Sequence, residues 1–300
     1  MEMKNVGIYA NPSKDVNMQG TKMVAKLLRE SGIHVSFDAG AIPEGERELI
    51  DYSKIDCLFV LGGDGTLLKA AQTASVHGVC ILGINLGRLG FLTEVELGDI
   101  AKAITLIQDG ACYVEERTML HGSIYADGEK RYEVEALNDI AVLKKDMSRM
   151  VRLELFIGGA LADFVDCDGM LVSTPTGSTG YSLSAGGPIL SPKLDCMLTT
   201  PICPHSLHSR TLVVSGDDEI VISPAAPGGI VLSADGVQQT EIHNEETVKI
   251  KRSKYKACFL RFHENYFYPL LRSKFLNWDD KLNVGGSDET GAAKRDTRAD

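Results

Sequence analysis

The sequence predicts an α/β plus all-β protein: an amino-terminal Rossmann-like parallel-sheet domain, then a β-sandwich domain, then a helix near the carboxyl end that packs back. Three observations predict this order. Short apolar runs alternate with amphipathic helical stretches over about the first 110 residues. Polar and apolar residues then alternate, with turns at short intervals. The chain has 300 residues, 44% of them hydrophobic, which is enough for two cores.

Residues 1–112 are expected to form the α/β domain. Four short apolar runs predict strands, and three longer stretches with apolar residues every three or four positions predict helices. The strands are expected at 5–10, 34–39, 57–62 and 79–85, and the helices at 18–32, 66–78 and 97–110. Strands separated by helices predict a parallel sheet, because a crossover helix returns the chain to the same end of the sheet.

Residues 113–263 are expected to form the all-β domain. Their polar and apolar side chains alternate, as in strands with one buried face. Asp127-Gly128 is a dipeptide typical of a tight hairpin turn, and Asp235-Gly236 predicts a second hairpin.

The carboxyl end changes character twice. Residues 264–282 return to a helical pattern despite Pro269, and this helix is expected to dock on one of the two domains. Residues 283–300 hold almost no large apolar side chain, so they are expected to be a disordered tail.

The composition limits which binding partners and which cellular compartment are expected. The formal net charge is -10, so the surface as a whole repels nucleic acid and anionic membranes, although local groups can still hold a small anion. The seven cysteines are scattered, without a CxxC pair, and several lie in apolar runs, as expected of free thiols in a reducing compartment. No signal peptide or membrane span is recognisable, which predicts a cytoplasmic protein.

The stretch "LFVLGGDGTLLKAA" (58–71) places three glycines around one acid, between a predicted strand and a predicted helix. The carboxyl end of a parallel strand is a usual ligand position, and the following helix offers free N–H groups and a positive dipole end to phosphate. Glycines let phosphate oxygens reach the backbone, and the last residue of the group is expected to cap the helix. The predicted phosphate loop consists of Gly62, Gly63, Gly65 and Thr66.

Asp64 is the unusual residue of this loop, because a carboxylate repels phosphate. Its presence is explained if its partner is a metal ion or a hydroxyl group that must lose a proton. The alternative is a glycine-rich turn with an aspartate cap. The sequence lacks both G-x-x-x-x-G-K-[ST] and a G-x-G-x-x-G after the first strand, so neither a Walker loop nor the dinucleotide fingerprint is present.

A second unusual stretch is "STPTGSTGYSLSAGGP" (173–188), which is rich in small and hydroxyl side chains. A long polar loop between apolar flanks is either a linker or functional. Hydroxyl and N–H groups can bind ribose and phosphate without adding charge. Tyr181 adds an aromatic face and a phenolic donor.

Four blocks in a fixed order resemble the NAD kinases, which phosphorylate the 2'-hydroxyl of the adenosine ribose of NAD with ATP or, in some members, polyphosphate. "GGDGT" alone also occurs in lipid kinases and phosphofructokinases, whereas the four blocks together are specific. The resemblance extends from residue 9 to residue 278. The blocks are "GGDGT" (62–66), "NLGRLGFLTE" (85–94), "NDI" (138–140) and "TPTGSTGYSLSAGGPI" (174–189).

The resemblance implies a set of substrate-binding residues. Asn138 and Asp139 are expected on the adenosine ribose, and Asp168 of "DCDGM" on the nicotinamide amide. Asp166 of the same segment is also expected to contact the substrate, although its position varies among relatives, and Gly180 stands where many relatives have Ala. The remaining expected NAD contacts are Asp64, Gly65, Arg149, Thr179, Gly180, Tyr181, Ser182, Leu183, Ser184 and Gln238.

The hypothesis for the reaction is in-line attack of the ribose hydroxyl on the terminal phosphate of ATP, with Asp64 as the catalytic base and Mg²⁺ or another divalent cation on the phosphates. No metal site made by the protein is predicted, because Cys203, His205 and His208 lack a second ligand pair.

Two alternatives remain open at this point: a kinase for another hydroxyl, such as a lipid or sugar phosphate, and a catalytically silent dinucleotide-binding regulator. The expected ligands are NAD and ATP. The resemblance further implies a homodimer or homotetramer whose subunits share the NAD site.

Overall fold

The computed structural model describes residues 3–87, 90–146, 149–226, 228–264 and 266–274. Met1–Phe262 forms one compact unit, and a second unit begins at His263. Both halves of the predicted architecture lie within the first unit, where an amino-terminal parallel sheet is followed by antiparallel strands.

The amino-terminal half contains the predicted parallel strands, which pair in the order β4-β3-β1-β2, with β5 beside β4. The prediction of a parallel sheet is confirmed. Its strands are β1 (Asn5–Ala10), β2 (His34–Phe37), β3 (Cys57–Gly62), β4 (Cys80–Asn85) and β5 (Val95–Glu96).

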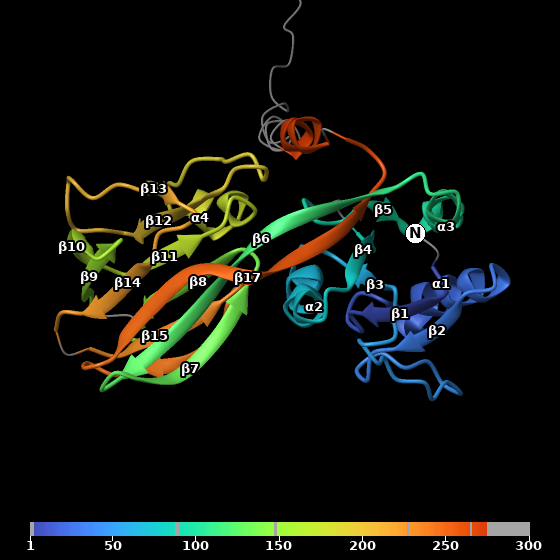
Figure 1. Cartoon of the computed structure of the whole chain (residues 1–300), viewed down its shortest axis with the longest axis horizontal. Helices are drawn as coiled ribbons and strands as arrows, with labels where there is room; N and C mark the ends of the chain where they lie inside the picture. Colours follow the sequence, from blue (N-terminus) through green and yellow to red (C-terminus); the bar gives the residue numbers. More distant parts are fainter. Residues whose placement is uncertain (1–2, 88–89, 147–148, 227, 265, 275–300) are drawn as a thin grey trace, which may run out of the picture. The chain divides into compact units, whose positions relative to one another are not determined.

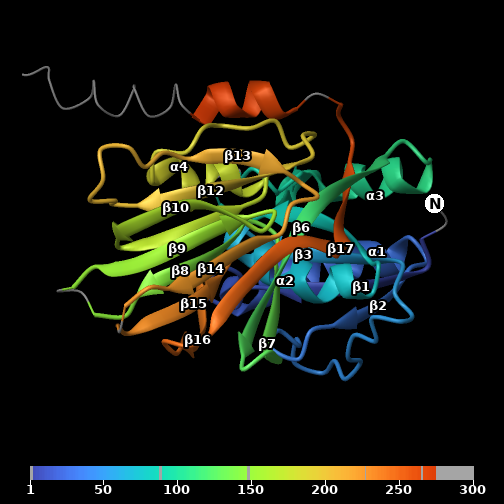
Figure 2. The same ribbon diagram turned by 60° about the vertical axis from the view of Figure 1, so that its left-hand side comes forward.

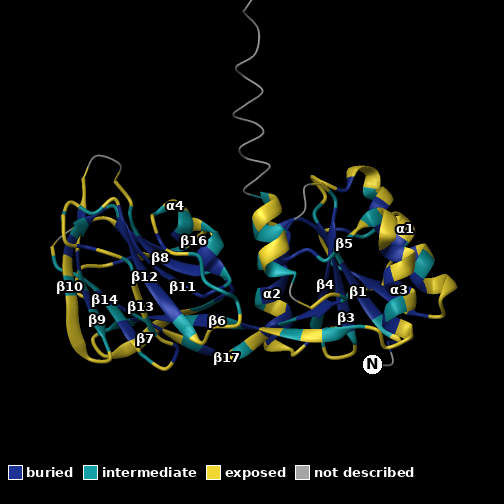
Figure 3. Cartoon of the chain, turned by 90° about the horizontal axis from the view of Figure 1, so that it is seen from above, coloured by how far each residue is buried: buried dark blue, intermediate teal, exposed yellow. Residues whose placement is uncertain are grey.

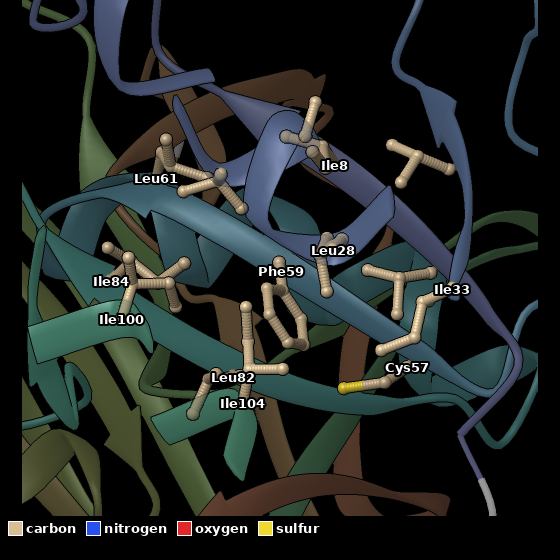
Figure 4. Packing of buried hydrophobic residues seen from close by; sticks show 14 of the residues in the cluster. Ile8, Leu28, Ile33, Cys57, Phe59, Leu61, Leu82, Ile84, Ile100 and Ile104 are labelled. Atoms are coloured by element: carbon tan, nitrogen blue, oxygen red, sulfur yellow. The ribbon is translucent and has the colours of Figure 1, made fainter. Parts of the chain in front are cut away.

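Helices cover both faces of this sheet. The apolar stripes of α1 (Gln19–Glu30) and α3 (Ile100–Gln108) pack on one face, and α2 (Asp64–Val76) packs on the other. Figure 4 shows the first of these cores, where side chains of both helices meet Phe59 and Leu82. Short 3-10 turns, η1 (Val16–Met18) and η2 (Leu97–Asp99), lead into α1 and α3.

The second half is a sandwich of two sheets, as predicted. The inner faces of both sheets contribute to one apolar core. One sheet has the order β13-β12-β11-β8-β15-β16, and the other contains β10-β9-β14-β17 with β6 and β7. The strands are β6 (Tyr113–Ala126), β7 (Glu129–Ala136), β8 (Asp139–Lys144), β9 (Val151–Ile157), β10 (Ala160–Cys167), β11 (Gly169–Ser173), β12 (Cys196–Ile202), β13 (Leu212–Ser215), β14 (Ile220–Pro224), β15 (Ile230–Ala234), β16 (Val237–Ile242) and β17 (Thr247–Arg261).

One sheet continues through both halves, which the sequence did not predict. The long strand β17 pairs antiparallel with β14 near its start and parallel with β4 near its end. β6 runs beside β17 along most of its length (Figure 1). The halves are therefore joined by shared backbone hydrogen bonds as well as by side chains.

Both predicted hairpin turns are present. Asp127 and Gly128 have φ of 49° and 82° between β6 and β7, and Asp235 and Gly236 have φ of 48° and 76° between β15 and β16. Such left-handed pairs match the twist of a two-residue hairpin. Figure 3 shows that the central strands of both halves are mostly buried, whereas outer strands such as β7, β10 and β13 are partly exposed and the helices expose one face.

The carboxyl-terminal helix is present over 267–274, and its docking stays a prediction. The rest of that helix and the predicted tail at 283–300 lie outside the described residues.

Candidate functional site

The glycine loop, residues 62–66, joins β3 to α2. Gly63 is the N-cap residue of α2, with extended backbone (φ -131°, ψ -173°), and the helix begins at Asp64. The expectation that Thr66 caps the helix is therefore wrong. Thr66 lies inside the first turn, where its Oγ1 accepts a hydrogen bond from Asn11 Nδ2 at 3.4 Å. A Cβ on Gly62 would lie 2.4 Å from that hydroxyl, so Thr66 itself requires a glycine there.

Asp64 is held by the chain segment that follows β4. Its carboxylate accepts hydrogen bonds from the backbone N–H of Phe91 at 2.8 Å and of Leu92 at 3.0 Å. Gly90 permits this approach, because a Cβ there would lie 1.8 Å from Asp64 Oδ1. Two bonds from fixed backbone donors set the orientation of the carboxylate. The blocks at 62–66 and 85–94 thus form one structural unit.

A cavity of about 410 Å³ opens beside the glycine loop. A Cβ on Gly63 would lie 2.8 Å from Lys14 Nζ, so this ammonium group reaches the loop backbone. Lys14 also lines a neighbouring cavity of about 440 Å³. The first cavity is lined by Tyr9, Ala10, Asn11, Pro12, Lys14, Gly65, Thr66 and Lys69.

Sequence reasoning missed Lys14 and Lys69 as cations for this cavity. A signal for Lys14 existed, because it lies in the loop that follows β1. The carboxyl end of β1 lies beside that of β3 through the pairing of Ala10 with Leu61.

The hydroxyl loop, residues 173–188, is bound to the "NDI" block. Thr174 donates its hydroxyl to the Leu137 carbonyl at 2.7 Å and its N–H to the Asn138 carbonyl at 2.9 Å. A Cβ on Gly177 would lie only 2.1 Å from the Asn138 oxygen. Asn138 and Asp139, predicted on the ribose, therefore share one site with this loop.

Asp235 holds the "NDI" block from the other side, and sequence reasoning assigned it only to a turn. Its carboxylate accepts the N–H groups of Leu137 at 2.9 Å, Asn138 at 2.7 Å and Asp139 at 3.3 Å. It also accepts Gln72 Nε2 from α2 at 3.3 Å. One side chain thus ties the "NDI" block to the helix that begins at the glycine loop.

The two carboxyl groups at 139 and 235 influence each other. Burial and, to a smaller extent, the charge of Asp235 together raise the pKa of Asp139 to about 7. Burial also raises the pKa of Asp235, although its backbone N–H donors and Gln72 act in the opposite direction. Both carboxyl groups therefore keep their proton to a higher pH than an exposed aspartate does.

Tyr181 and Asp168 lie in the neighbourhood of Asp139. Burial raises the pKa of Tyr181, and the charges of Cys203, Asp139 and Asp168 add to this effect. The Tyr181 side chain is nevertheless 44% exposed, so one face is open to a ligand. Asp168 forms an ion pair with Lys144 at 2.6 Å.

The hydroxyl loop contains two short helical turns, η3 (Gly177–Thr179) and α4 (Tyr181–Ser184). α4 lies against β12 (Figure 2), because the fully buried Ser182 bonds Thr200 through their hydroxyls at 3.0 Å. The Ser182 hydroxyl thus holds the loop in place. Leu183 is half-buried and Ser184 is exposed.

The other predicted residues lie on separate elements. Asp166, on β10, forms a bidentate ion pair with Arg152 at 2.7 and 2.8 Å. Arg149 is exposed just before β9, and Gln238 is exposed on β16. No contact described for these three side chains joins them to Asn138 or to the hydroxyl loop.

A buried charge network connects the two loops. Arg261 binds the Leu92 carbonyl at 3.1 Å and Glu94 at 2.8 Å. It also binds Glu115 at 2.9 Å, which in turn binds Arg117 at 3.0 Å. Arg117 donates to Thr176 Oγ1 at 3.0 Å, within the hydroxyl loop.

The charges of this network are mutually compensated. Burial alone would raise the pKa of Glu115, but Arg117 and Arg261 outweigh burial and hold that pKa below its ordinary value. The network therefore spans from the segment that orients Asp64 to the hydroxyl loop.

The fold and the site together define a nucleotide-dependent phosphotransferase. A glycine loop at a helix N-terminus, a lysine beside it and an oriented carboxylate are groups suited to phosphoryl transfer. Comparisons with known proteins identify the family. The ATP-NAD kinase N-terminal domain matches residues 6–112, and the ATP-NAD kinase C-terminal domain matches residues 137–262. The chain belongs to the NAD kinase family, and it is an enzyme of the kinase class.

Relatives support this assignment over nearly the whole length. The chain is 41% identical to the NAD kinase of Moorella thermoacetica, over 97% of this chain and 94% of the relative. It is 40% identical to that of Clostridium beijerinckii, over 92% and 96%. An Archaeoglobus fulgidus NAD kinase structure in complex with ATP matches with a TM-score of 0.71 and 26% identity, over 90% of this chain and 98% of that one. Yeast NADH kinase complexed with NADH shares the fold, with a TM-score of 0.80 and 24% identity, over 98% and 91%.

Proposed function

We propose that this chain transfers the terminal phosphoryl group of ATP to the 2'-hydroxyl of the adenosine ribose of NAD, giving NADP. One observation carries the proposal. The helix that begins with Asp64 also reaches, through Gln72, the Asp235 carboxylate that holds Asn138 and Asp139. The proposed base and the proposed ribose contacts therefore belong to one hydrogen-bonded assembly.

In this proposal Asp64 accepts the hydroxyl proton as the ribose oxygen attacks phosphorus in line. The N-terminus of α2 and Lys14 neutralise the phosphates in the cavity beside the glycine loop. The two backbone bonds to Asp64 hold its carboxylate in one orientation, which a positioned base requires.

On the NAD side, Asn138 and Asp139 bind the adenosine ribose, and Asp168 binds the nicotinamide amide. Thr179, Gly180, Tyr181 and Ser184 complete this site, together with Gln238, Arg149 and the backbone of Ser182 and Leu183. In this proposal Asp168 contacts both the ligand and Lys144, with which it forms an ion pair. We propose a homodimer or homotetramer as the assembly.

A divalent cation such as Mg²⁺ fits as a companion of ATP. Within the described residues no group of three His, Cys, Asp or Glu side chains is arranged to hold a metal. Mg²⁺ commonly binds phosphate oxygens and water with only one or two protein carboxylates, and Asp64 is the carboxylate of the glycine loop. When bound, the cation neutralises charge on the transferring phosphoryl group.

Within the described part of the chain, no helix is long and apolar enough to cross a membrane. We propose a cytoplasmic enzyme.

The test is incubation of the full chain with NAD, ATP and Mg²⁺, with NADP detected through an NADP-dependent dehydrogenase. Lipid and sugar phosphate acceptors are assayed in parallel. Asp64→Asn should lower kcat by about 10²–10⁴-fold while NAD affinity, measured by calorimetry, stays within about threefold. Asp127→Asn, the same change in an exposed turn, is the matched control and should retain full activity.

Each alternative function predicts a different result in this assay. NADP formation by Asp64→Asn at the normal rate would remove Asp64 from the role of base. Phosphorylation of another acceptor without NADP would support the lipid or sugar kinase, and NAD binding without turnover would support the silent regulator.

A further inference from the structure

Three of the seven cysteines form a row across the parallel sheet. Cys57 on β3 is the pairing partner of Cys80 on β4. Phe259 on β17 pairs in parallel with Ile81, so the preceding residues, Cys258 and Cys80, lie side by side. Ile81 and Phe259 belong to the core under α2, whereas Cys57 and Cys80 face the core under α1 and α3. Because side chains alternate along a strand, Cys258 points to the same face as Cys80.

Cys80 and Cys258 are in direct contact. Their thiol groups share a hydrogen bond, and both residues are half-buried and within reach of small reagents. Neighbouring strands lie about 4.8 Å apart, which is within the roughly 4.4–6.8 Å between α-carbons that a disulfide spans. Cys57 differs because it is fully buried, and Figure 4 shows it next to Ile33.

The two thiols have unequal acidity. The hydrogen bond from Cys80 lowers the pKa of Cys258 to about 7, against burial and the charge of Glu116, with help from Lys256. The same hydrogen bond and burial raise the pKa of Cys80. Burial raises the pKa of Cys57. A thiolate is the reactive form, so Cys258 is the nucleophile of the pair.

We propose that Cys80 and Cys258 are a site of reversible oxidation that forms a disulfide between β4 and β17. With a peroxide as oxidant, the Cys258 thiolate attacks one peroxide oxygen, the O–O bond breaks, and hydroxide leaves to become water. The Cys80 sulfur then attacks the Cys258 sulfenic acid, forming the S–S bond and releasing a second water. Two thiols lose two electrons and two protons, and one hydrogen peroxide becomes two waters.

The position of this pair gives the bond a structural consequence. Three residues after Cys258, Arg261 binds the Leu92 carbonyl and Glu94 in the segment that orients Asp64. Cys80 starts the strand that leads into the same segment. A disulfide would therefore link the two strands that flank it.

The experiment maps thiols in the full chain. The reduced protein is treated with a few equivalents of hydrogen peroxide, free thiols are blocked with N-ethylmaleimide, and digested peptides are analysed by mass spectrometry. The expected result is a peptide pair linked through Cys80 and Cys258, loss of two free thiols per chain, and reversal by dithiothreitol. Cys196→Ser, which removes another half-buried thiol, should leave the linkage intact.

Two variants separate the steps. Cys80→Ser should leave a sulfenic acid on Cys258 that reacts with dimedone, and Cys258→Ser should abolish both products. Linkage of Cys80 to Cys57, linkage between chains through the exposed Cys203, or free thiols at both 80 and 258 while Cys203 is oxidised would overturn the proposal. Because mass spectrometry reads the thiols directly, this outcome is independent of whether the chain phosphorylates NAD.

Discussion

The glycine loop and the hydroxyl loop both depend on glycine, but for different reasons. Among the described residues, no atom lies within 4 Å of the position that a Cβ on Gly65 would occupy, so this side of the glycine loop is open. In the hydroxyl loop a Cβ on Gly177 would collide with Asn138 at 2.1 Å. One glycine leaves space for a ligand, and the other allows two chain segments to touch. Substitution of either glycine is expected to lower activity. The free energy of unfolding should distinguish the two, because it should fall only when the glycine of the hydroxyl loop is replaced.

Gly177→Ala should have the largest effect on stability. The new methyl group meets backbone rather than a flexible side chain, so the "NDI" block and the hydroxyl loop must separate. We expect a loss of about 3 kcal/mol or more in the free energy of unfolding, together with loss of NAD binding. Urea unfolding and calorimetry with NAD measure the two effects. A stable variant that binds NAD normally would contradict the close contact.

Asp235→Asn should have the next largest effect. Asn keeps the shape and tolerates the left-handed backbone at φ 48°, but it presents an NH₂ group to backbone N–H donors. We expect a loss of about 2 kcal/mol in the free energy of unfolding and about a tenfold higher KM for NAD.

Asp127→Asn is the matched control, because Asp127 also precedes a glycine in a hairpin turn, with φ 49°. Its stability should change by less than about 0.5 kcal/mol. Equal losses in both variants would mean that the hairpin turn matters and the bonds to Leu137, Asn138 and Asp139 do not.

The pH dependence of stability tests the same region with a smaller effect. Burial and Asp235 raise the pKa of Asp139 from 3.8 to about 7, so the folded chain binds more protons than the unfolded chain between these values. This contribution to stability is complete below pH 4 and is lost as the pH rises toward 7, at no more than about 1.4 kcal/mol per pH unit.

The measurement is the difference in unfolding free energy between the wild-type chain and Asp139→Asn, from pH 4 to pH 8. The free energy of unfolding of the wild type should fall relative to that of Asp139→Asn as the pH rises to about 7, and the difference should then stay constant. A difference that is independent of pH would place Asp139 in a more solvated environment than the structure gives it.

These predictions also show which features of the fold and the site could be predicted from neighbouring residues in the sequence. The strands, the two Asp-Gly hairpins and the glycine loop were predictable, because each signal lies within a few neighbouring residues. The backbone partners of Asp235 lie 96 to 98 residues earlier, and Arg261 binds Glu94 across 167 residues. The second pairing of β17 is equally non-local. A single sequence does not show which distant residues come into contact. The groups that hold the site were therefore missed, although many of the candidate residues were named.

Gly65→Ala should have the smallest effect on stability. It is therefore the most informative comparison with Gly177→Ala in the hydroxyl loop. A methyl group at this position meets open space, and Ala favours helix over Gly, so the free energy of unfolding should stay constant or rise by up to about 1 kcal/mol. If phosphate approaches the loop backbone here, the same methyl group displaces it, and a shift of about 1 Å can cost on the order of 10²-fold in rate. We expect kcat/KM for ATP to fall at least about tenfold while NAD affinity is unchanged. A variant with full activity would mean that phosphate binds elsewhere in the cavity, near Lys14 and Lys69 rather than at the start of α2.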